Sequence, residues 1–268
     1  MYLPIKPHKT CASAWLDATK TVDACSHHES HNVIIDIENP LKQTTADKKI
    51  IDGVDELLRR SEGVMPVQAV ANTIFPDALY RRYGMPDLYK KYLEEVLPRT
   101  KRNANDWGRY FERMICRKTS TGKIINPLST LVEKLKRNVH GDGHTYRNIY
   151  EMVLSDPALD VPIFNPELDR RVMGGQCLSF LSFKLDNQNR LMLTAIYRNH
   201  YYIQRLLGNL IGLSRLMSFV CKEASIEIGS LTVVSTHAQV DIPKGCKRKD
   251  IDNLIASCDK ASQTSEAA

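Results

Sequence analysis

The segment QCLSFLSFKLDNQNRLMLTAIYRN (176–199) decides the fold. It contains two runs rich in apolar residues, 177–186 and 190–199, on either side of the polar triplet 187–189. Two such runs around a short polar turn are typical of a β-hairpin. The sequence therefore predicts two neighbouring strands of a sheet, with Cys177 opening the first and Arg198 near the end of the second.

A helix and a third strand are predicted downstream of this hairpin. Residues 201–222 are apolar on nearly every side, which is typical of a buried helix. Residues 227–242 then resemble another strand, which carries Thr236 and His237. The helix carries one amide side chain in an apolar setting, Asn209.

Upstream, strands and amphipathic helices alternate less regularly. The predicted elements are a strand at 32–40, helices at 48–63, 87–97 and 125–138, and a short strand near 148–152. These elements mix strands and helices, so we expect an α+β fold. We divide the chain into a variable N-terminal segment (1–47), a main domain (48–244) and a polar C-terminal tail (245–268) that we expect to be frayed.

Composition excludes several classes of protein. The 268 residues carry a net charge of +6, which suits an anionic ligand such as a phosphate. A nucleic-acid protein is a weak alternative that rests on this charge and on Lys244, Lys247, Arg248 and Lys249. No apolar run approaches the roughly 20 residues of a membrane span, and the N-terminus does not resemble a signal peptide. We therefore expect a cytoplasmic protein without membrane contact.

The seven cysteines are odd in number and scattered, without a CxxC pair. This pattern predicts reduced thiols rather than a disulfide framework or a zinc site. Residues 1–32 are polar, and a cluster of Cys25, His27, His28, Glu29 and His31 within them could be a metal site or solvated surface. Because its spacing matches no zinc pattern, we favour solvated surface and predict no metal.

From Cys177 the chain continues through a strand, a turn, a second strand with Arg198, a helix with Asn209, Gly229 and Thr236-His237. This order resembles that of the thymidylate synthases and the related nucleotide hydroxymethylases. In that family a cysteine opens a strand, an Arg-Ser pair binds the substrate phosphate, and an asparagine lies on the next helix. The interval from Arg198 through Asn209 to Gly229 keeps the family's spacing.

Upstream motifs extend the resemblance to roughly residues 48–241. ELLRRSEG places Glu56 seven residues before a glycine, as the family's glutamate helix does. WGRYFER (107–113) resembles its Tyr-Gly-x-x-Trp-Arg segment. LSTLVEKLKR followed by TYRNI resembles its Leu-rich helix and Ser-Arg-Arg site, of which Arg147 remains.

The resemblance implies a thymidylate synthase-like fold, in which helices cover a large mixed sheet, and a sheet-to-sheet homodimer. It implies a pyrimidine nucleoside monophosphate such as dUMP as substrate, and a transferase of one-carbon groups, methyl or hydroxymethyl. Catalytic roles would fall to Cys177 as nucleophile, Glu56 as proton relay and His237. Substrate-binding roles would fall to Arg198 and Arg147 at the phosphate, Asn209 at the base, and to Asn199 and Gln176.

The residue types suit that chemistry. A thiolate can add to the electron-poor C6 of a pyrimidine, and a nearby cation such as Arg198 lowers a thiol pKa. Purely structural roles for these residues remain as alternatives. Cys177 could be a structural thiol, Asn209 could cap backbone inside a buried helix, and Glu56 could belong to a solvated helix face.

Residues on the folate side of the family pattern differ here. The family's aspartate after the Arg-Ser pair falls at Tyr201, the serine itself at Asn199, and the tyrosine of His-x-Tyr at Gln239. Losing an acid leaves pterin donors unpaired, so the sequence argues against ordinary use of methylene-tetrahydrofolate. Two hypotheses follow: a divergent enzyme, or a binding or sensor subunit that keeps the nucleotide pocket without folate chemistry.

Overall fold

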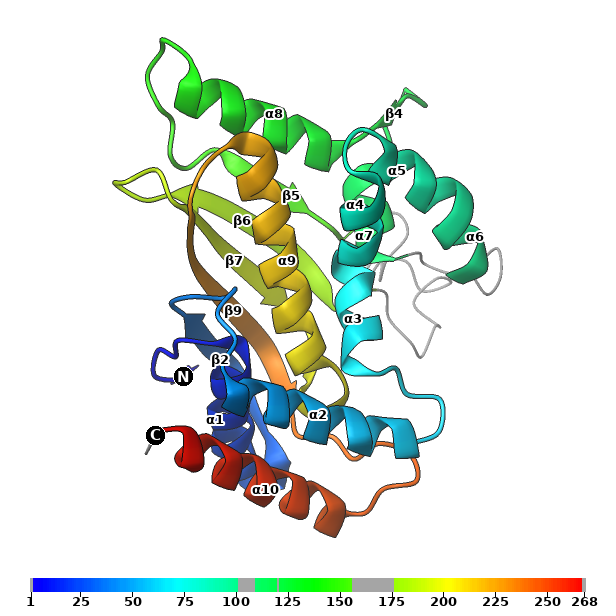
Figure 1. Ribbon diagram of the computed structural model, residues 1–268, viewed down its shortest axis with the longest axis vertical. Helices are drawn as coiled ribbons and strands as arrows, with labels where there is room; N and C mark the ends of the chain where they lie inside the picture. The colour runs from blue at the N-terminus through cyan, green and yellow to red at the C-terminus, as the bar shows by residue number, and fades with distance from the viewer. Residues whose placement is uncertain (1, 101–108, 120, 156–175, 267–268) are drawn as a thin grey trace, which may run out of the picture.

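The computed structural model describes residues 2–100, 109–119, 121–155 and 176–266 (Figure 1). One mixed sheet has the order β1-β2-β9-β7-β6-β5, with β8 paired to β9. Its strands are β1 (Leu3–Pro4), β2 (Glu29–Ile37), β5 (Tyr150–Val153), β6 (Leu178–Leu185), β7 (Leu191–Tyr197), β8 (His200–Tyr201) and β9 (Ile228–Gln239). The predicted α+β class with a large mixed sheet is confirmed.

Helices and a small ribbon complete the described chain. The helices are α1 (Cys11–Asp23), α2 (Thr45–Arg60), α3 (Val67–Ile74), α4 (Asp77–Tyr83), α5 (Asp87–Lys91), α6 (Leu97–Thr100), α7 (Tyr110–Ile115), α8 (Pro127–His140), α9 (Leu207–Ala224) and α10 (Arg248–Glu266). Short helical turns are η1 (Ser26–His28), η2 (Tyr92–Val96) and η3 (Tyr202–Leu206), and the ribbon is β3 (Arg117–Lys118) with β4 (Ile124–Ile125). No helix within the described ranges is long and apolar enough to cross a membrane.

The predicted hairpin forms as β6 and β7, and its turn is held by Asp186. The Asp186 carboxylate accepts hydrogen bonds from the backbone N–H of Gln188 at 2.8 Å and of Arg190 at 2.9 Å. Asn189 takes a left-handed backbone conformation with φ of 59°, which asparagine tolerates better than most residues. The turn thus sets which residues face each other as far as Phe180 and Ile196, and the pairing shifts by one residue between Phe180 and Leu178.

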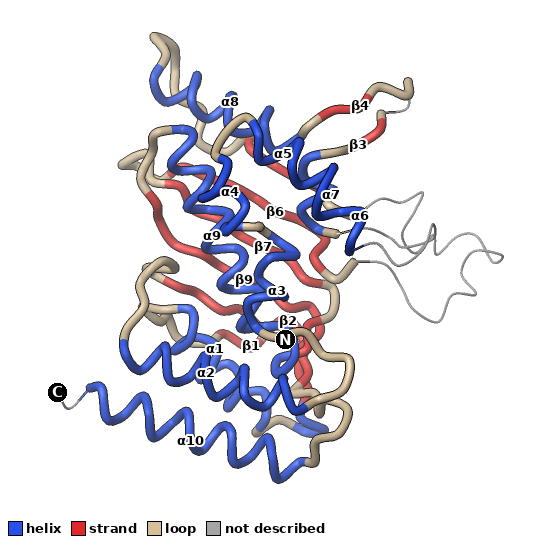
Figure 2. The backbone as a smooth tube through the Cα atoms, turned by 45° about the vertical axis from the view of Figure 1, so that its right-hand side comes forward, coloured by secondary structure: helices blue, strands red, loops and turns tan. Residues whose placement is uncertain are grey.

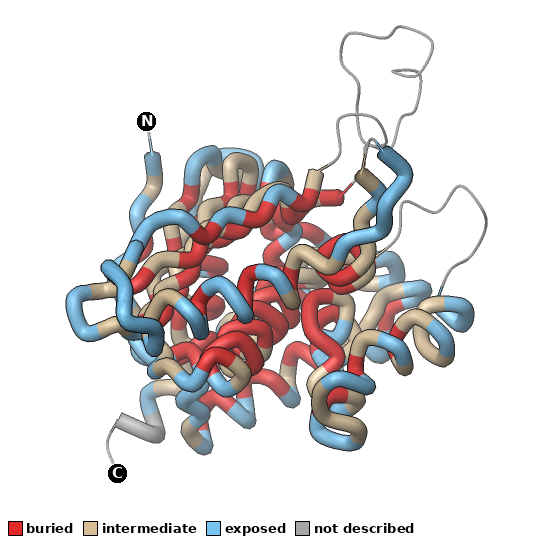
Figure 3. Tube along the Cα trace, turned by 90° about the horizontal axis from the view of Figure 1, so that it is seen from above, coloured by how far each residue is buried: buried red, intermediate tan, exposed pale blue. Residues whose placement is uncertain are grey.

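The buried helix α9 carries the chain from β7 back to β9, which runs parallel to β7. It packs so closely on α3 that a side chain would not fit at two of its glycines. A Cβ at Gly208 would lie 2.6 Å from the Cβ of Val70, and one at Gly212 would lie 2.8 Å from the carbonyl oxygen of Ala71. Figure 3 shows the buried residues gathered where the helices meet the sheet.

The helices that contact the sheet pack on one of its faces (Figure 2). On strands β2, β9, β7 and β6, every second residue of the central part is buried on this face, and the residues between remain partly exposed. The strand register aligns four of these partly exposed apolar side chains in one row: Phe180, Ile196, Val234 and Ile34.

Both flanking segments of the sequence join the same core, contrary to two expectations. Residues 1–32 are not all solvated surface: α1 buries Trp15 completely, and the indole N–H donates to the carbonyl oxygen of Tyr202 at 2.8 Å. The expectation of a frayed tail is wrong for α10, which packs along α2 and buries Ile251 (Figure 1). In both segments a narrow apolar stripe lies in an otherwise polar sequence. The division at 47 and 244 stays a prediction.

Replacing Ile251 by alanine should lower the free energy of unfolding by about 2–5 kcal/mol, because it leaves a cavity between α10 and α2. Urea denaturation would measure the change. The control is Asn253→Ala, an exposed position on the same helix. Equal midpoints for the two variants would contradict the packing of α10.

Candidate functional site

The candidate site lies at the edge of the sheet where β6 begins and β7 and β9 end. The backbone N–H of Arg198 donates to the carbonyl oxygen of Cys177 at 2.9 Å, so the two residues are neighbours. Thr236 Oγ1 donates to the carbonyl oxygens of Tyr197 and Arg198 at 3.2 and 2.9 Å. Residues from three strands are thus tied together at one point.

Cys177 is half-buried, and its electrostatic environment has two opposing parts. Burial raises the pKa of the thiol above its ordinary value, while the positive charges of Arg198 and Arg205 act to lower it. Arg198 is held by a hydrogen bond from its Nε to the carbonyl oxygen of Gln176 at 3.0 Å. The sulfur is therefore a thiol that two guanidinium groups can help to ionise.

Two residues at the site were not among the predicted ones. Arg205 lies on η3, and its Nη1 is buried without a hydrogen-bond partner in the described chain. Tyr110 opens α7, and its hydroxyl accepts from the backbone N–H of Leu178 at 3.3 Å. Burial raises the pKa of Tyr110, so its hydroxyl stays protonated. The available signals were an arginine in an otherwise apolar stretch and the tyrosine inside the motif WGRYFER, of which 107 and 108 lie outside the described residues.

His237 lies beside Asn199 at the same edge. Its Nδ1 is 2.6 Å from Asn199 Oδ1, and its Nε2 is 3.4 Å from a carboxylate oxygen of Glu29 on β2. His31, directly opposite His237 in the strand register, places its ring 5.2 Å away. His237 therefore contacts Asn199, the residue that follows Arg198 in the sequence.

Asn209 is buried and bonded inside the protein. Its Nδ2 lies 2.9 Å from Nε2 of His200, whose Nδ1 lies 3.0 Å from Ser235 Oγ. Burial lowers the pKa of His200 to about 3, so the ring is neutral at pH 7. A neutral ring that accepts at Nε2 carries its proton on Nδ1 and donates to Ser235. To contact a uracil edge, Asn209 would have to use its carbonyl oxygen or break this bond.

For two of the predicted site residues, the described part of the chain shows no contact with Cys177. The carboxylate of Glu56 is exposed on α2 and pairs with Arg60 one turn later. Arg147 lies in the loop before β5 and donates to Asn187 Oδ1 at 3.0 Å. Within one chain, the roles predicted for them have no described geometric support, and both stay predictions.

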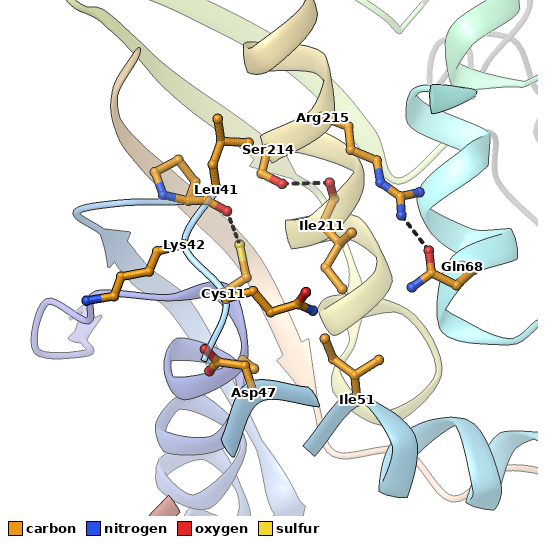
Figure 4. Close-up of a pocket in the computed structure, with 12 residues that line it drawn as sticks. Cys11, Leu41, Lys42, Asp47, Ile51, Gln68, Ile211, Ser214 and Arg215 are labelled. Atoms are coloured by element: carbon orange, nitrogen blue, oxygen red, sulfur yellow. Dashed lines mark hydrogen bonds between the residues drawn. The ribbon is translucent and has the colours of Figure 1, made fainter. Parts of the chain in front are cut away.

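Cys11 is buried, whereas Cys177 is half-buried. Cys11 lines a cavity of about 250 Å³ at the opposite end of β2, between α1, α2 and α9 (Figure 4). Burial and the neighbouring Asp47 raise its pKa to about 12. Asp47 itself accepts hydrogen bonds from Thr10 at 2.7 Å and from the backbone N–H of Thr44 at 2.6 Å, which caps α2. These groups serve the local packing.

Two alternatives from the sequence can be placed in the structure. In the described ranges, no three histidine, cysteine or acidic side chains are arranged to hold a metal ion. Of the basic residues near the C-terminal helix, Lys244 pairs with Glu62 at 2.6 Å, and Arg248 pairs with Asp252 at 2.8 Å and with Asp23. Acidic partners thus offset part of that positive charge.

A partial sequence match to one known protein agrees with the resemblance. A scan against protein-family models finds no match. Over 123 residues the chain is 25% identical to a protein of Methanosarcina mazei described as "Putative thymidylate synthase", covering 45% of this chain and 56% of the relative. The match thus spans little more than half the relative's length. A solved structure, thermostable thymidylate synthase A from Bacillus subtilis, superposes with a TM-score of 0.49 at 13% identity, over 94% of this chain and 84% of that one. The sequence match supports a divergent thymidylate synthase-like protein.

Alkylation of Cys177 should have a pH midpoint above that of an ordinary cysteine, because burial favours the neutral thiol. Arg205→Gln should raise the midpoint further, since it removes a charge that favours the thiolate. Iodoacetamide rates measured by peptide mass spectrometry would give both values. The control is Arg137→Gln, an exposed arginine that is not among the charges acting on Cys177. A midpoint below that of an ordinary cysteine, or one unchanged by Arg205→Gln, would contradict this description of the site.

Proposed function

We propose that this protein binds a pyrimidine nucleoside monophosphate and activates C5 of the base through addition of Cys177 to C6. The observation that supports this most directly is a half-buried thiol under the influence of two arginines at one edge of the sheet. A buried neutral thiol alone would be inert, and cations alone would bind any anion. Their combination suits a nucleophile that ionises as an anionic ligand fills the site.

The proposed step balances as a conjugate addition. The thiol loses its proton to solvent, and the thiolate forms an S–C6 bond. The C5–C6 double bond opens at the same time, and its electron pair spreads over C5 and the carbonyl oxygen O4. The nucleophilic C5 then attacks a one-carbon electrophile: an aldehyde-type carbon gives a hydroxymethyl product, and a methyl group on a carrier gives a methyl product while the carrier leaves with the bonding electron pair. Loss of the C5 proton to solvent re-forms the C5–C6 double bond and expels the Cys177 thiolate. The hydroxyl of Tyr110, which accepts from the Leu178 N–H, lies close to the thiol.

The phosphate would be bound by Arg198 with Asn199, and by Arg147 of a partner subunit. A guanidinium presents a fork of donors that matches phosphate oxygens. Arg198 is exposed and lies next to the thiol, so one nucleotide can span both groups. Gln176, whose carbonyl oxygen orients Arg198, would support the same contact.

A reduced folate does not fit the described residues as the one-carbon donor. The position of the family's acidic residue is held by Tyr201, a neutral side chain that is 40% exposed. A phenol cannot replace a carboxylate that accepts from two pterin donors. We therefore derive no step through folate.

A second candidate function is a nucleotide-binding or sensor subunit without turnover. The bond between Asn209 and His200 favours it, because the amide that would read the base is already used inside the protein. Such a protein would bind the phosphate and sugar and hold the thiol near C6 without driving substitution at C5.

We also propose that two copies pair through the uncovered sheet face. The row Phe180, Ile196, Val234 and Ile34 gives this face an apolar centre that the helices leave partly exposed. An apolar row of this kind across four strands is the type of surface that dimers bury.

Incubation with 5-fluoro-2′-deoxyuridine monophosphate should add its mass to the peptide that contains Cys177, because the electron-withdrawing fluorine at C5 makes C6 more electrophilic. Mass spectrometry with and without methylene-tetrahydrofolate would detect the adduct. Cys177→Ser should abolish it, and Cys116→Ser should leave it unchanged. If neither fluorinated uridine nor cytidine monophosphates form an adduct, Cys177 is not the nucleophile. Tight calorimetric binding without an adduct would then support the sensor function.

Val234→Asp should convert a dimer to a monomer, because it buries a charge at the centre of the apolar row. Light scattering after size-exclusion chromatography would measure the mass. The control is Ile124→Asp, which changes a side chain that is 67% exposed on the separate ribbon. A wild-type monomer at all concentrations, or a dimer that survives Val234→Asp, would contradict the proposed interface.

A further inference from the structure

The N-terminal segment contributes to the candidate site through Glu29. This residue opens β2 and lies two positions before His31, the direct cross-strand partner of His237 on β9. Diagonal neighbours on paired strands are close enough for long side chains to meet. The carboxylate of Glu29 accordingly lies 3.4 Å from Nε2 of His237.

His237 in turn fixes the side chain of Asn199. Its Nδ1 is 2.6 Å from Asn199 Oδ1, and this is the only hydrogen bond that the described residues make to the Asn199 side chain. Since the amide carbonyl oxygen and the Glu29 carboxylate are both acceptors, each ring nitrogen carries a proton and donates when both hydrogen bonds are made. The other branch of the planar amide, Nδ2 with its two N–H donors, is then directed away from the ring.

The backbone around Asn199 is fixed as well. Thr236 Oγ1 donates to the carbonyl oxygens of Tyr197 and Arg198, the two residues before Asn199. Arg198, the residue before Asn199, donates from its backbone N–H to the carbonyl oxygen of Cys177 and from its Nε to the carbonyl oxygen of Gln176. The free donors of Asn199 and the guanidinium of Arg198 therefore share one short, anchored segment.

We infer that Glu29 and His237 form a positioning chain that holds the Asn199 amide with its N–H donors ready for a phosphate bound at Arg198. This inference rests on the proposed nucleotide function and deepens it. Asn199 is the residue that would touch the ligand, and Glu29 and His237 are positioning residues that act through it. The role of His237 thus changes from a catalytic residue to one that orients an amide.

The positioning chain should affect recognition of the phosphate rather than of the base. Asn199→Asp replaces the two donors by an anion of the same shape, so it should weaken binding of uridine monophosphate about 10- to 100-fold. Binding of uridine, which lacks the phosphate, should change little. Glu29→Ala should weaken only monophosphate binding, about 2- to 10-fold, because the ring that orients the amide is no longer fixed.

A double-mutant cycle tests whether Glu29 acts through Asn199. Calorimetry with uridine monophosphate and with uridine is done on the full chain and on Glu29→Ala, Asn199→Ala and the double variant. In the Asn199→Ala background, Glu29→Ala should have no further effect. Glu29→Gln can still hydrogen-bond to His237 and should retain most of the affinity. Glu62→Ala, which removes an exposed carboxylate paired with Lys244, controls for the change in net charge.

Each outcome decides the inference. Additive losses in the double variant, equal losses for uridine and its monophosphate, or a matching loss in Glu62→Ala would overturn the positioning chain. The proposed function would survive those results if Cys177 still formed its adduct with the fluorinated nucleotide. A wild-type protein that binds no pyrimidine monophosphate would overturn both.

Discussion

The candidate site depends on the backbone hydrogen bond from Arg198 to Cys177. This 2.9 Å contact closes the open end of the β6–β7 hairpin and places a guanidinium beside a thiol. A slip of one residue in a strand register turns every side chain to the other face of a sheet. The Asp186 turn sets the register as far as Phe180, and an irregularity between Leu178 and Phe180 then shifts the pairing by one residue. Both features therefore decide which residue of the second strand faces Cys177.

The crossover through α9 adds the third strand to this pair. Because β9 runs parallel to β7, their carboxyl ends meet at the same edge of the sheet, and Thr236 reaches the backbone that carries Arg198. The close contact of Gly208 and Gly212 with α3 shows that the helix has little freedom to shift. A rigid scaffold of this kind suits a site whose groups come from several strands.

The polar groups in and around the site are bonded in two separate networks. The buried network joins Asn209, His200 and Ser235 near the start of α9, and burial keeps His200 neutral. The outer network joins Glu29, His237 and Asn199 and reaches the residue beside Arg198. The first restricts what Asn209 can offer a ligand, and the second connects the N-terminal segment to the site.

The sequence by itself determined the elements whose pattern is local. The hairpin, the buried helix and β9 follow from alternation and from apolar runs. The proximity of Cys177 and Arg198 was implied by the family resemblance, and in the structure it depends on the shift in pairing between Leu178 and Phe180. Only the tertiary structure decided that Arg205, Tyr110 and Glu29 join them, and that α1 and α10 belong to the core. The sequence around a charged or polar residue does not indicate which distant residue it will contact. A narrow apolar stripe can be recognised as part of the core only when the element that covers it is known. The physical reason is that these contacts join residues far apart in the chain, so they exist only once the sheet and its helices have packed.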